Sequence, residues 1–304
     1  MLRVVHHPDY VSPPAAGSRF SFDKYQLVMT ALEQSGIAME IREPEPMPTK
    51  WIEALHDPTY VEQVRNCRVP TAIERRIGFP VTAHVARRAV LAPGGTWLAA
   101  MLALRHGFAA NAAGGTHHAQ AAHGAGYCVF NDLAITANRL IAEGRVARVM
   151  IVDLDVHQGD GTAALLHDRP DIFTFSIHSE SNFPARKARS DFDLGLPDGT
   201  DDADYMAALA EHLLPALDAH IPDIILYQAG VDPHHDDRLG RLALTDRGLE
   251  LRDRFVMQAA TERGIPLASA LGGGYGDDRS AVAGRHARSI LALYRQFHEG
   301  PTAA

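Results

Sequence analysis

Cysteine is scarce in this sequence, which has only Cys67 and Cys128 among 304 residues. Two cysteines do not make a disulfide framework, and this composition fits a reducing compartment. The N-terminal residues lack a charged segment followed by a long apolar stretch, so they do not resemble a signal peptide. No run of about 18 apolar residues is available to span a bilayer. We therefore expect a cytoplasmic protein with no membrane span.

Clusters of basic residues are also missing. The chain has 29 Lys and Arg against 37 Asp and Glu, which gives a formal net charge of −8. Neighbouring basic residues form short pairs, such as Arg75-Arg76 and Arg87-Arg88. Because binding to a nucleic acid backbone needs clustered positive charge, we expect no nucleic acid partner. The acidic balance would instead favour a basic protein substrate.

The sequence does contain a regular alternation of short apolar runs and longer helical patterns. Hydrophobic residues make up 46% of the chain, enough for a large core. The runs predicted as strands are residues 2–6, 109–111, 148–153, 172–177, 223–228 and 266–271. The stretches predicted as helices are residues 22–35, 81–105, 132–143, 203–220, 245–263 and 280–297. Continuous apolar strands joined by helices predict one doubly wound α/β domain over residues 1–304, with a parallel sheet covered on both faces.

Polar residues follow five of these predicted strands. The segments that begin after residues 111, 152, 175, 228 and 270 are rich in histidine, aspartate, tyrosine and glycine. In a doubly wound sheet the ligand crevice lies outside the carboxyl ends of the strands. The sequence therefore predicts a functional site at this edge of the sheet.

A metal site is predicted within the stretch DLDVHQGDG at residues 153–161. Asp155 and His157 are two residues apart at a strand end, so their side chains point to the same side. Asp232, just after another strand, can supply a third ligand. Such a set leaves one position of a four-coordinate zinc open, as in catalytic sites. The alternative is that these residues cap helices and form turns, which is common for aspartate.

Two adjacent histidines, His117 and His118, form a second candidate element in a loop flanked by glycine. A histidine that acts as an acid or base needs its other ring nitrogen held by a carboxylate or carbonyl. Asp153 and Asp160 are not needed as metal ligands, so two His–Asp pairs can form. The alternative for such a pair is solvent exposure. We interpret two other pairs as structural or solvent-facing, namely His6-His7 and His234-His235.

Tyr275 follows three glycines at residues 272–274. No Gly-Lys-Ser/Thr follows these glycines, which excludes a P-loop. Their small size lets the tyrosine hydroxyl approach a reacting oxygen and donate to a developing oxyanion. The alternative is a buried tyrosine beside a tight turn.

Taken together, these motifs resemble the zinc-dependent histone deacetylase family, with matching order and spacing over roughly residues 3–296. Several details are closer to its class IV branch and bacterial members, including HQGDG and the early Arg19, Phe20, Lys24 and Tyr25. The motifs that carry the resemblance are HHA at 117–119, GYCVFND at 126–132, DLDVHQGDG at 153–161, AGVDPHHDDRLG at 229–240 and GGGY at 272–275. The resemblance implies the arginase–deacetylase fold, an α/β architecture with a central parallel sheet of about eight strands and helices on both faces.

The resemblance also implies roles for individual residues. Zinc would be held by Asp155, His157 and Asp232. His117 would pair with Asp153 and His118 with Asp160, while Tyr275 would bind the substrate carbonyl oxygen. The predicted wall of the acyl-lysine tunnel consists of Gly126, Tyr127 and Phe183. A structural potassium ion would use backbone oxygens of Asp153, Asp155, His157 and Ile177 with the Ser176 hydroxyl. Arg19 would line an inner channel.

One departure concerns substrate recognition. The family often has an aspartate that grips the substrate backbone just before the helix that begins near residue 81, and here Gly78 lies near that place. The Phe183-Pro184 segment also replaces a longer loop, and the basic stretch ARKARSD follows it.

The function that we predict is that of a zinc-dependent amidohydrolase, which removes acetyl or longer fatty-acyl groups from the ε-amine of lysine. His118 is the predicted general base and then acid, although the sequence does not separate its role from that of His117. One alternative is a deacetylase of acetylated polyamines or other small amides. A second is a binding module for acyl-lysine that does not cleave it. A third, a binuclear manganese hydrolase, is disfavoured because Gly159 and His234 stand where it needs carboxylates.

Overall fold

The computed structural model describes residues 1–11 and 22–300. Eight strands form one sheet in the order β2-β1-β3-β8-β7-β4-β5-β6, and every neighbouring pair is parallel. The strands are β1 (Leu2–Val5), β2 (Met39–Arg42), β3 (Phe108–Asn111), β4 (Val149–Asp153), β5 (Ile172–Ser179), β6 (Phe192–Leu196), β7 (Ile224–Gln228) and β8 (Leu267–Ala270). The predicted parallel sheet is therefore confirmed.

Continuous apolar runs in the sequence predicted the central strands correctly. All residues of β3, β4, β7 and β8 are buried, because helices cover both faces of the sheet. The two outermost strands, β2 and β6, were not predicted. Both are partly exposed, so neither has a continuous apolar run in its sequence. Edge strands carry a weaker hydrophobic signal than central ones.

Ten α-helices are present in the described chain, and the six long ones were all predicted. They are α1 (Lys24–Gln34), α2 (Thr49–Ile52), α3 (Pro58–Arg65), α4 (Thr71–Ile77), α5 (Ala83–His106), α6 (Asp132–Ala142), α7 (Asp160–Leu166), α8 (Asp202–His220), α9 (Asp246–Glu262) and α10 (Arg279–Glu299). The helices α2, α3, α4 and α7 were missed, since four to eight residues are too few to establish a helical period.

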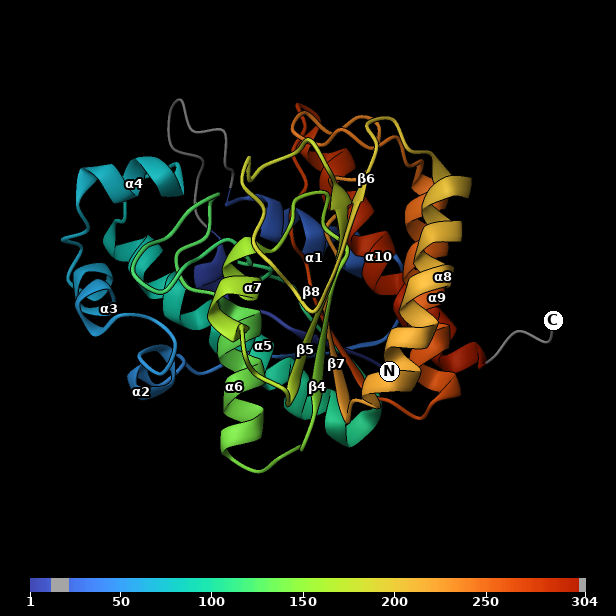
Figure 1. Cartoon of the computed structure of the whole chain (residues 1–304), viewed down its shortest axis with the longest axis horizontal. Helices are drawn as coiled ribbons and strands as arrows, with labels where there is room; N and C mark the ends of the chain where they lie inside the picture. The colour runs from blue at the N-terminus through green and yellow to red at the C-terminus, as the bar shows by residue number, and fades with distance from the viewer. Residues whose placement is uncertain (12–21, 301–304) are drawn as a thin grey trace.

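The helices form two layers around the sheet. Figure 1 shows α6 and α7 on one side of the central strands and α8 and α9 on the other, with α2, α3 and α4 at the periphery. Along β4, Val149 and Ile151 pack into the apolar layer shared with α5 and α6. The alternate residues Met150 and Val152 pack into the larger layer shared with α1, α8, α9 and α10. This alternation is the two-residue period of a strand buried on both faces.

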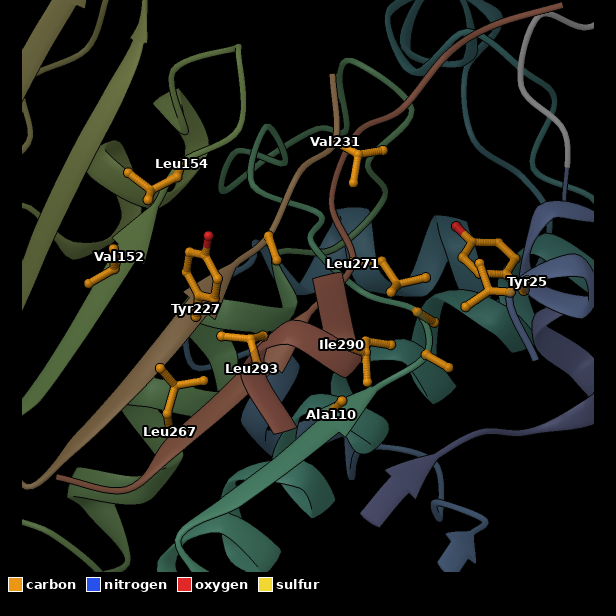
Figure 2. Packing of buried hydrophobic residues seen from close by; sticks show 14 of the residues in the cluster. Tyr25, Ala110, Val152, Leu154, Tyr227, Val231, Leu267, Leu271, Ile290 and Leu293 are labelled. Atoms are coloured by element: carbon orange, nitrogen blue, oxygen red, sulfur yellow. The ribbon is translucent and has the colours of Figure 1, made fainter. Parts of the chain in front are cut away.

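The larger layer lies directly beneath the loops that follow the strands. In Figure 2 Tyr227 of β7, Leu267 of β8 and Leu293 of α10 lie close together in this layer. Leu154 and Val231, from the loops after β4 and β7, extend the same layer toward the carboxyl edge of the sheet. The core therefore supports the loops that carry the predicted site. In the part of the chain that the structure describes, no helix has the length and apolar character to cross a membrane.

Candidate active site

Five loops meet at the carboxyl edge of the sheet. They follow β3, β8, β7, β4 and β5, which are consecutive neighbours in the sheet. Every residue predicted as catalytic, metal-binding or substrate-binding lies in one of these loops, at the end of β4 or at the start of α7. The strand order thus brings together side chains that are far apart in the sequence.

The three predicted metal ligands converge. The Nδ1 atom of His157 lies 3.0 Å from Oδ1 of Asp155 and 3.1 Å from Oδ2 of Asp232. All three side chains are buried, with exposed fractions of 7% for His157, 1% for Asp155 and 0% for Asp232. One ligand atom from each residue lies within 4.8 Å of the others.

This donor set fits a zinc ion. Two ligands of tetrahedral zinc, each about 2.0–2.2 Å from the metal, are separated by about 3.3 Å, close to the spacing seen between His157 and each carboxylate. An imidazole nitrogen carries at most one hydrogen, so Nδ1 of His157 cannot donate fully to both carboxylates. Two buried carboxylates on one nitrogen are instead suited to a shared divalent cation, whose charge they neutralise.

Backbone groups fix the other oxygens of the two carboxylates. The N–H of Gly273 donates to Oδ2 of Asp155 at 2.7 Å, and the N–H of Val156 donates to Oδ1 of Asp232 at 3.0 Å. A Cβ atom at Gly273 would lie 1.9 Å from Oδ2 of Asp232, and one at Gly230 would lie 2.4 Å from Oδ2 of Asp155. These two positions therefore require glycine, because the backbone itself lines the site.

The charges of the three side chains are strongly coupled. In the protein chain alone, burial and the neighbouring Asp155 raise the pKa of Asp232 to about 7. Burial opposes the charged form of His157, but its hydrogen bonds to Asp155 and Asp232 raise its pKa to about 10. The cluster thus favours positive charge at its centre.

Both predicted His–Asp pairs are present. Nδ1 of His117 lies 2.7 Å from Oδ2 of Asp153, and Nδ1 of His118 lies 2.6 Å from Oδ1 of Asp160. The two imidazole rings are 4.1 Å apart between centroids. Burial opposes charge on His117, yet Asp153 and Asp155 raise its pKa to about 9. Burial and the charge of His117 lower the pKa of His118 to about 4.

The loop that carries the two histidines is held by residues that the sequence analysis did not single out as functional. The carboxylate of Asp132 accepts hydrogen bonds from the backbone of Gly115, at 3.1 Å, and of Thr116, at 2.7 Å. Nδ2 of Asn131 donates to the carbonyl of His117 at 3.3 Å. In the sequence, Asn131 and Asp132 stood out only as the end of the motif GYCVFND, and in the structure Asn131 accepts the N–H of Ala134 as the cap of α6.

Tyr275 lies beside the metal ligands. Its ring centroid is 6.5 Å from that of His157. Asp237 fixes its backbone, since Oδ2 accepts the Tyr275 N–H at 2.6 Å, and the Arg238 N–H donates to the Tyr275 carbonyl. Burial and the charges of Asp232 and Asp155 raise the pKa of Tyr275. The phenol therefore keeps its proton and can donate a hydrogen bond.

Aromatic side chains, including those predicted to wall a tunnel, pack against these groups. The ring of Phe183 packs edge-on against His118 at 4.9 Å, and the ring of Tyr127 lies 5.5 Å from Tyr275. Gly126 has a φ of +53°, and a Cβ there would lie 2.4 Å from the His118 ring. Phe183 is 46% exposed, so it stands at the outer end of the site.

Gly78 also lies at this rim. It ends α4 with a φ of +98°, and a Cβ there would lie 2.7 Å from the ring of Tyr127. The rings of Phe79 and Tyr127 are stacked, with their centroids 6.3 Å apart. The position that often carries an aspartate in the resembled family is thus filled by an aromatic wall.

Three of the predicted potassium ligands, Asp153, Ser176 and Ile177, lie on neighbouring strands, and Asp155 and His157 lie in the loop after β4. Asp153 of β4 and Ser176 of β5 are directly paired in the sheet. The Ser176 hydroxyl lies 2.9 Å from Nδ1 of His178, which leaves oxygen lone pairs for a cation if the hydroxyl donates. The potassium site stays a prediction. Arg19, predicted to line an inner channel, lies outside the described residues.

The positions that a second metal would need are occupied differently. A Cβ at Gly159 would lie 2.3 Å from Oδ2 of Asp153, so no carboxylate fits there. Nδ1 of His234 accepts the backbone N–H of Asp236 and its Nε2 faces Asp246 at 3.4 Å. His234 is buried, while the side chain of its neighbour His235 is about half exposed, so this pair matches the structural and solvent-facing interpretation.

The fold and this site define an α/β protein with a candidate metal centre beside two His–Asp pairs and a tyrosine, a set suited to hydrolysis. Comparison with known proteins gives the family. A model of the histone deacetylase domain matches residues 18–291. The chain belongs to the histone deacetylase family.

Individual proteins are also similar to this chain over most of its length. The chain is 46% identical over 285 residues to an uncharacterized protein of Picosynechococcus sp., covering 93% of this chain and 95% of the relative. It is 32% identical over 296 residues to histone deacetylase 2 of Arabidopsis thaliana, covering 91% and 74% of the two chains. It is 26% identical over 322 residues to a probable deacetylase of Methanothermobacter thermautotrophicus, covering 99% and 93%.

The solved structure of the HDA15 HD domain confirms the fold. It superposes with a TM-score of 0.78 at 20% identity, covering 98% of this chain and 96% of that chain. The predicted arginase–deacetylase fold is therefore correct. The protein is a deacetylase-family enzyme, a hydrolase that acts on amides, and its family domain implies dependence on zinc.

Proposed function

We propose that this protein is a zinc-dependent deacylase that removes acetyl or longer fatty-acyl groups from the ε-amine of lysine. The observation that carries the proposal is the convergence of Asp155, His157 and Asp232 on one buried point. The His–Asp pairs and Tyr275 stand around that point. This combination supplies a metal seat, an acid–base group and an oxyanion donor for amide hydrolysis.

Asp155, His157 and Asp232 would hold the zinc ion. When bound, zinc would polarise the substrate carbonyl and increase the acidity of the attacking water. The backbone N–H groups of Gly273 and Val156 orient the two carboxylates from outside. The protein thereby fixes the ligands before the metal arrives, which limits the cost of ordering them.

His118 would take a proton from the attacking water and then deliver one to the leaving amine. Asp160 holds Nδ1 of His118, and this leaves Nε2 as the nitrogen that exchanges protons. The edge-on contact of His118 with the exposed Phe183 supports this role at the proposed substrate entrance. His117 would act mainly as an electrostatic partner, because its Nε2 is 3.8 Å from the carboxylate of Asp155.

Tyr275 would donate its phenol proton to the carbonyl oxygen as negative charge develops there. Its backbone is fixed by Asp237, so the donor is oriented before the reaction. Tyr127 and Phe183, with Gly126 between Tyr127 and His118, would wall the passage for the acyl-lysine side chain. A potassium ion at Ser176 and Asp153 would stiffen the end of β4.

A small acylated amine, such as an acetylated polyamine, is the second candidate substrate. Gly78 favours it, because this position has no side chain with which to hold a peptide backbone. A protein substrate would then need other contacts at the rim, which the exposed Phe183 offers.

The test is a panel of lysine peptides whose acyl groups rise in length from acetyl to myristoyl, together with N-acetylated polyamines, each with and without a chelator. We expect turnover of at least one acyl-lysine peptide, which chelation abolishes and zinc restores. Turnover of polyamines alone would favour the second candidate. Binding of acyl-lysine without turnover of any substrate would contradict the deacylase proposal and indicate a binding module.

A further inference from the structure

A buried arginine lies behind the metal ligands and takes no part in the chemistry proposed above. Arg252, in the second turn of α9, is fully buried. Its Nη1 donates to two backbone carbonyls, at 2.7 Å to Gly230 and at 3.2 Å to Leu154. The same guanidinium donates from Nε to Asp253 at 2.9 Å.

The two carbonyls belong to the two segments that carry the metal ligands. Leu154 lies between Asp153 and Asp155 at the end of β4, and Gly230 lies two residues before Asp232 in the loop after β7. One side chain from a helix thus connects the main chain of both segments. If the contact of Arg252 with either carbonyl were lost, that segment could shift and move its ligand, Asp155 or Asp232.

The orientation of the guanidinium is itself fixed. Oδ1 of Asp253 accepts from Nε of Arg252 and also from the hydroxyl of Tyr227 at 2.6 Å. Tyr227 belongs to β7, the strand that leads into Gly230, and its position in the apolar layer beneath the loops is visible in Figure 2. The chain of contacts therefore begins at Tyr227 on β7, passes through α9 and ends at Gly230 in the loop that follows β7.

Stability alone does not explain this arrangement. Desolvation of a buried ion pair offsets much of its attraction, and apolar residues of similar size often stabilise a core equally well. Arginine offers several N–H groups in one rigid plane, which suits simultaneous contact with a carboxylate and two carbonyls. Its donors are used here on the backbone of the ligand-bearing segments.

We propose that Arg252 is a positioning residue, which sets the distance between Asp155 and Asp232 and thereby the affinity of the site for zinc. This proposal rests on one part of the proposed function, namely that the site binds zinc. Gly230 approaches Asp155 so closely that a Cβ would lie 2.4 Å from its Oδ2. Arg252 therefore holds the carbonyl of a residue, Gly230, that packs directly against the ligand Asp155.

The test compares Arg252→Lys with Arg169→Lys in the full chain. Lysine keeps the charge beside Asp253 but cannot reach a carboxylate and two carbonyls together. Arg169 is the control, because it also binds an aspartate, Asp171, and a residue of another element, Asn138, but it lies before the amino end of β5, at the opposite edge of the sheet from the ligands. The measurements are the zinc dissociation constant by chelator competition, the thermal midpoint, and kcat and KM.

For Arg252→Lys we expect zinc affinity to fall about 10- to 100-fold, the range seen for groups that orient metal ligands, with kcat reduced and KM little changed at subsaturating zinc. Arg169→Lys should lower the thermal midpoint without changing zinc affinity. Wild-type zinc affinity in a folded Arg252→Lys protein would overturn the positioning role and leave a purely structural pair.

Tyr227→Phe provides a second variant if Arg252→Lys does not fold. It removes one hydrogen bond to Asp253 and nothing else, so a smaller loss of zinc affinity, about threefold, is expected. Unchanged affinity would again contradict the proposal. Failure of the wild-type chain to bind zinc would overturn the proposed function itself, whereas zinc binding without deacylase activity would leave the role of Arg252 intact.

Discussion

Two groups of histidine and aspartate in the described chain have ligand atoms close enough to share a metal ion, but their surroundings differ. Asp155, His157 and Asp232 are all buried. In the second group, the side chains of His235 and Asp236 are 51% and 60% exposed. The ligand atoms of the first group face one another.

The second group already has partners for its donor and acceptor atoms. Nδ1 of His234 accepts a backbone N–H, and Nδ1 of His235 lies 3.1 Å from a backbone carbonyl. Arg285 binds Asp236 at 2.9 Å. The comparison shows that ligand spacing alone does not define a metal site. Two buried carboxylates that meet at one histidine nitrogen make a divalent ion favourable, whereas the exposed Asp236 of the second group is already bound by arginine.

The largest effect is expected from Asp232→Asn in the first group, compared with Asp236→Asn in the second. Asp232→Asn keeps the size of the side chain and the acceptor for Val156, but it removes a charged ligand. We expect loss of bound zinc and a fall in activity beyond the roughly hundred- to thousandfold cost of removing one electrostatic partner. Asp236→Asn is the control and should retain both zinc and activity. Equal zinc loss in the two variants, measured by elemental analysis, would abolish the distinction between the groups.

Tyr275→Phe separates metal binding from chemistry in the first group. The phenyl ring keeps the packing against Tyr127 and His157, and the backbone bond to Asp237 is unaffected. Removal of the hydroxyl should lower kcat by about a hundredfold or more, because one oxyanion donor is lost. Zinc content should stay at one per chain. A variant with near wild-type kcat would show that Tyr275 is not the donor.

Gly273→Ala sharpens the comparison at the level of the backbone, since only the first group has main chain packed against its carboxylates so closely. The new Cβ would lie 1.9 Å from Oδ2 of Asp232. We expect zinc affinity to fall by about tenfold or more. The matched control is Gly284→Ala within α10, where the nearest atom to a new Cβ is 3.7 Å away. Zinc competition should leave the control unchanged, and a wild-type result for both variants would refute the close approach.

The smallest effect concerns the arginines of the second group. Arg285 and Arg288 both bind Asp246, and Arg285 also binds Asp236. Replacement of both arginines by glutamine should cost at most about 3 kcal/mol of folding free energy, because each of these three pairs contributes at most about 1 kcal/mol. Calorimetric zinc titration of this double variant should show a weak second binding event. A tight second zinc in the wild-type chain would contradict the interpretation of this group.

The two groups also differ in how much of each could be predicted from the sequence. The order Asp-x-His after a buried strand, with Asp232 after another, was enough to predict the three converging ligands, because parallel strands end at one edge. The His–Asp pairs followed from the surplus of aspartates nearby. His234 and His235 follow the same strand as Asp232, but they formed an isolated pair and were interpreted as structural or solvent-facing.

Other parts of the site had no local signal. Arg252 and Asp237 act through backbone groups that are distant in the sequence, so their contacts appear only when the helix and loops pack. Asp132 belonged to the motif GYCVFND, but nothing in the sequence showed that its carboxylate holds the backbone of the histidine loop. The edge strands β2 and β6 were missed because partial exposure interrupts their apolar pattern. The cytoplasmic location and the potassium ion stay predictions.

The central claim is that one zinc ion, bound by Asp155, His157 and Asp232, supports amide hydrolysis. The most direct test removes all metal from the full-length chain with a chelator and then titrates zinc back while the hydrolysis of an acyl-lysine peptide is measured. We predict that activity disappears on chelation and returns in proportion to zinc, with a plateau at one ion per chain. Activity that survives complete metal removal, or that needs two ions per chain, would contradict this claim.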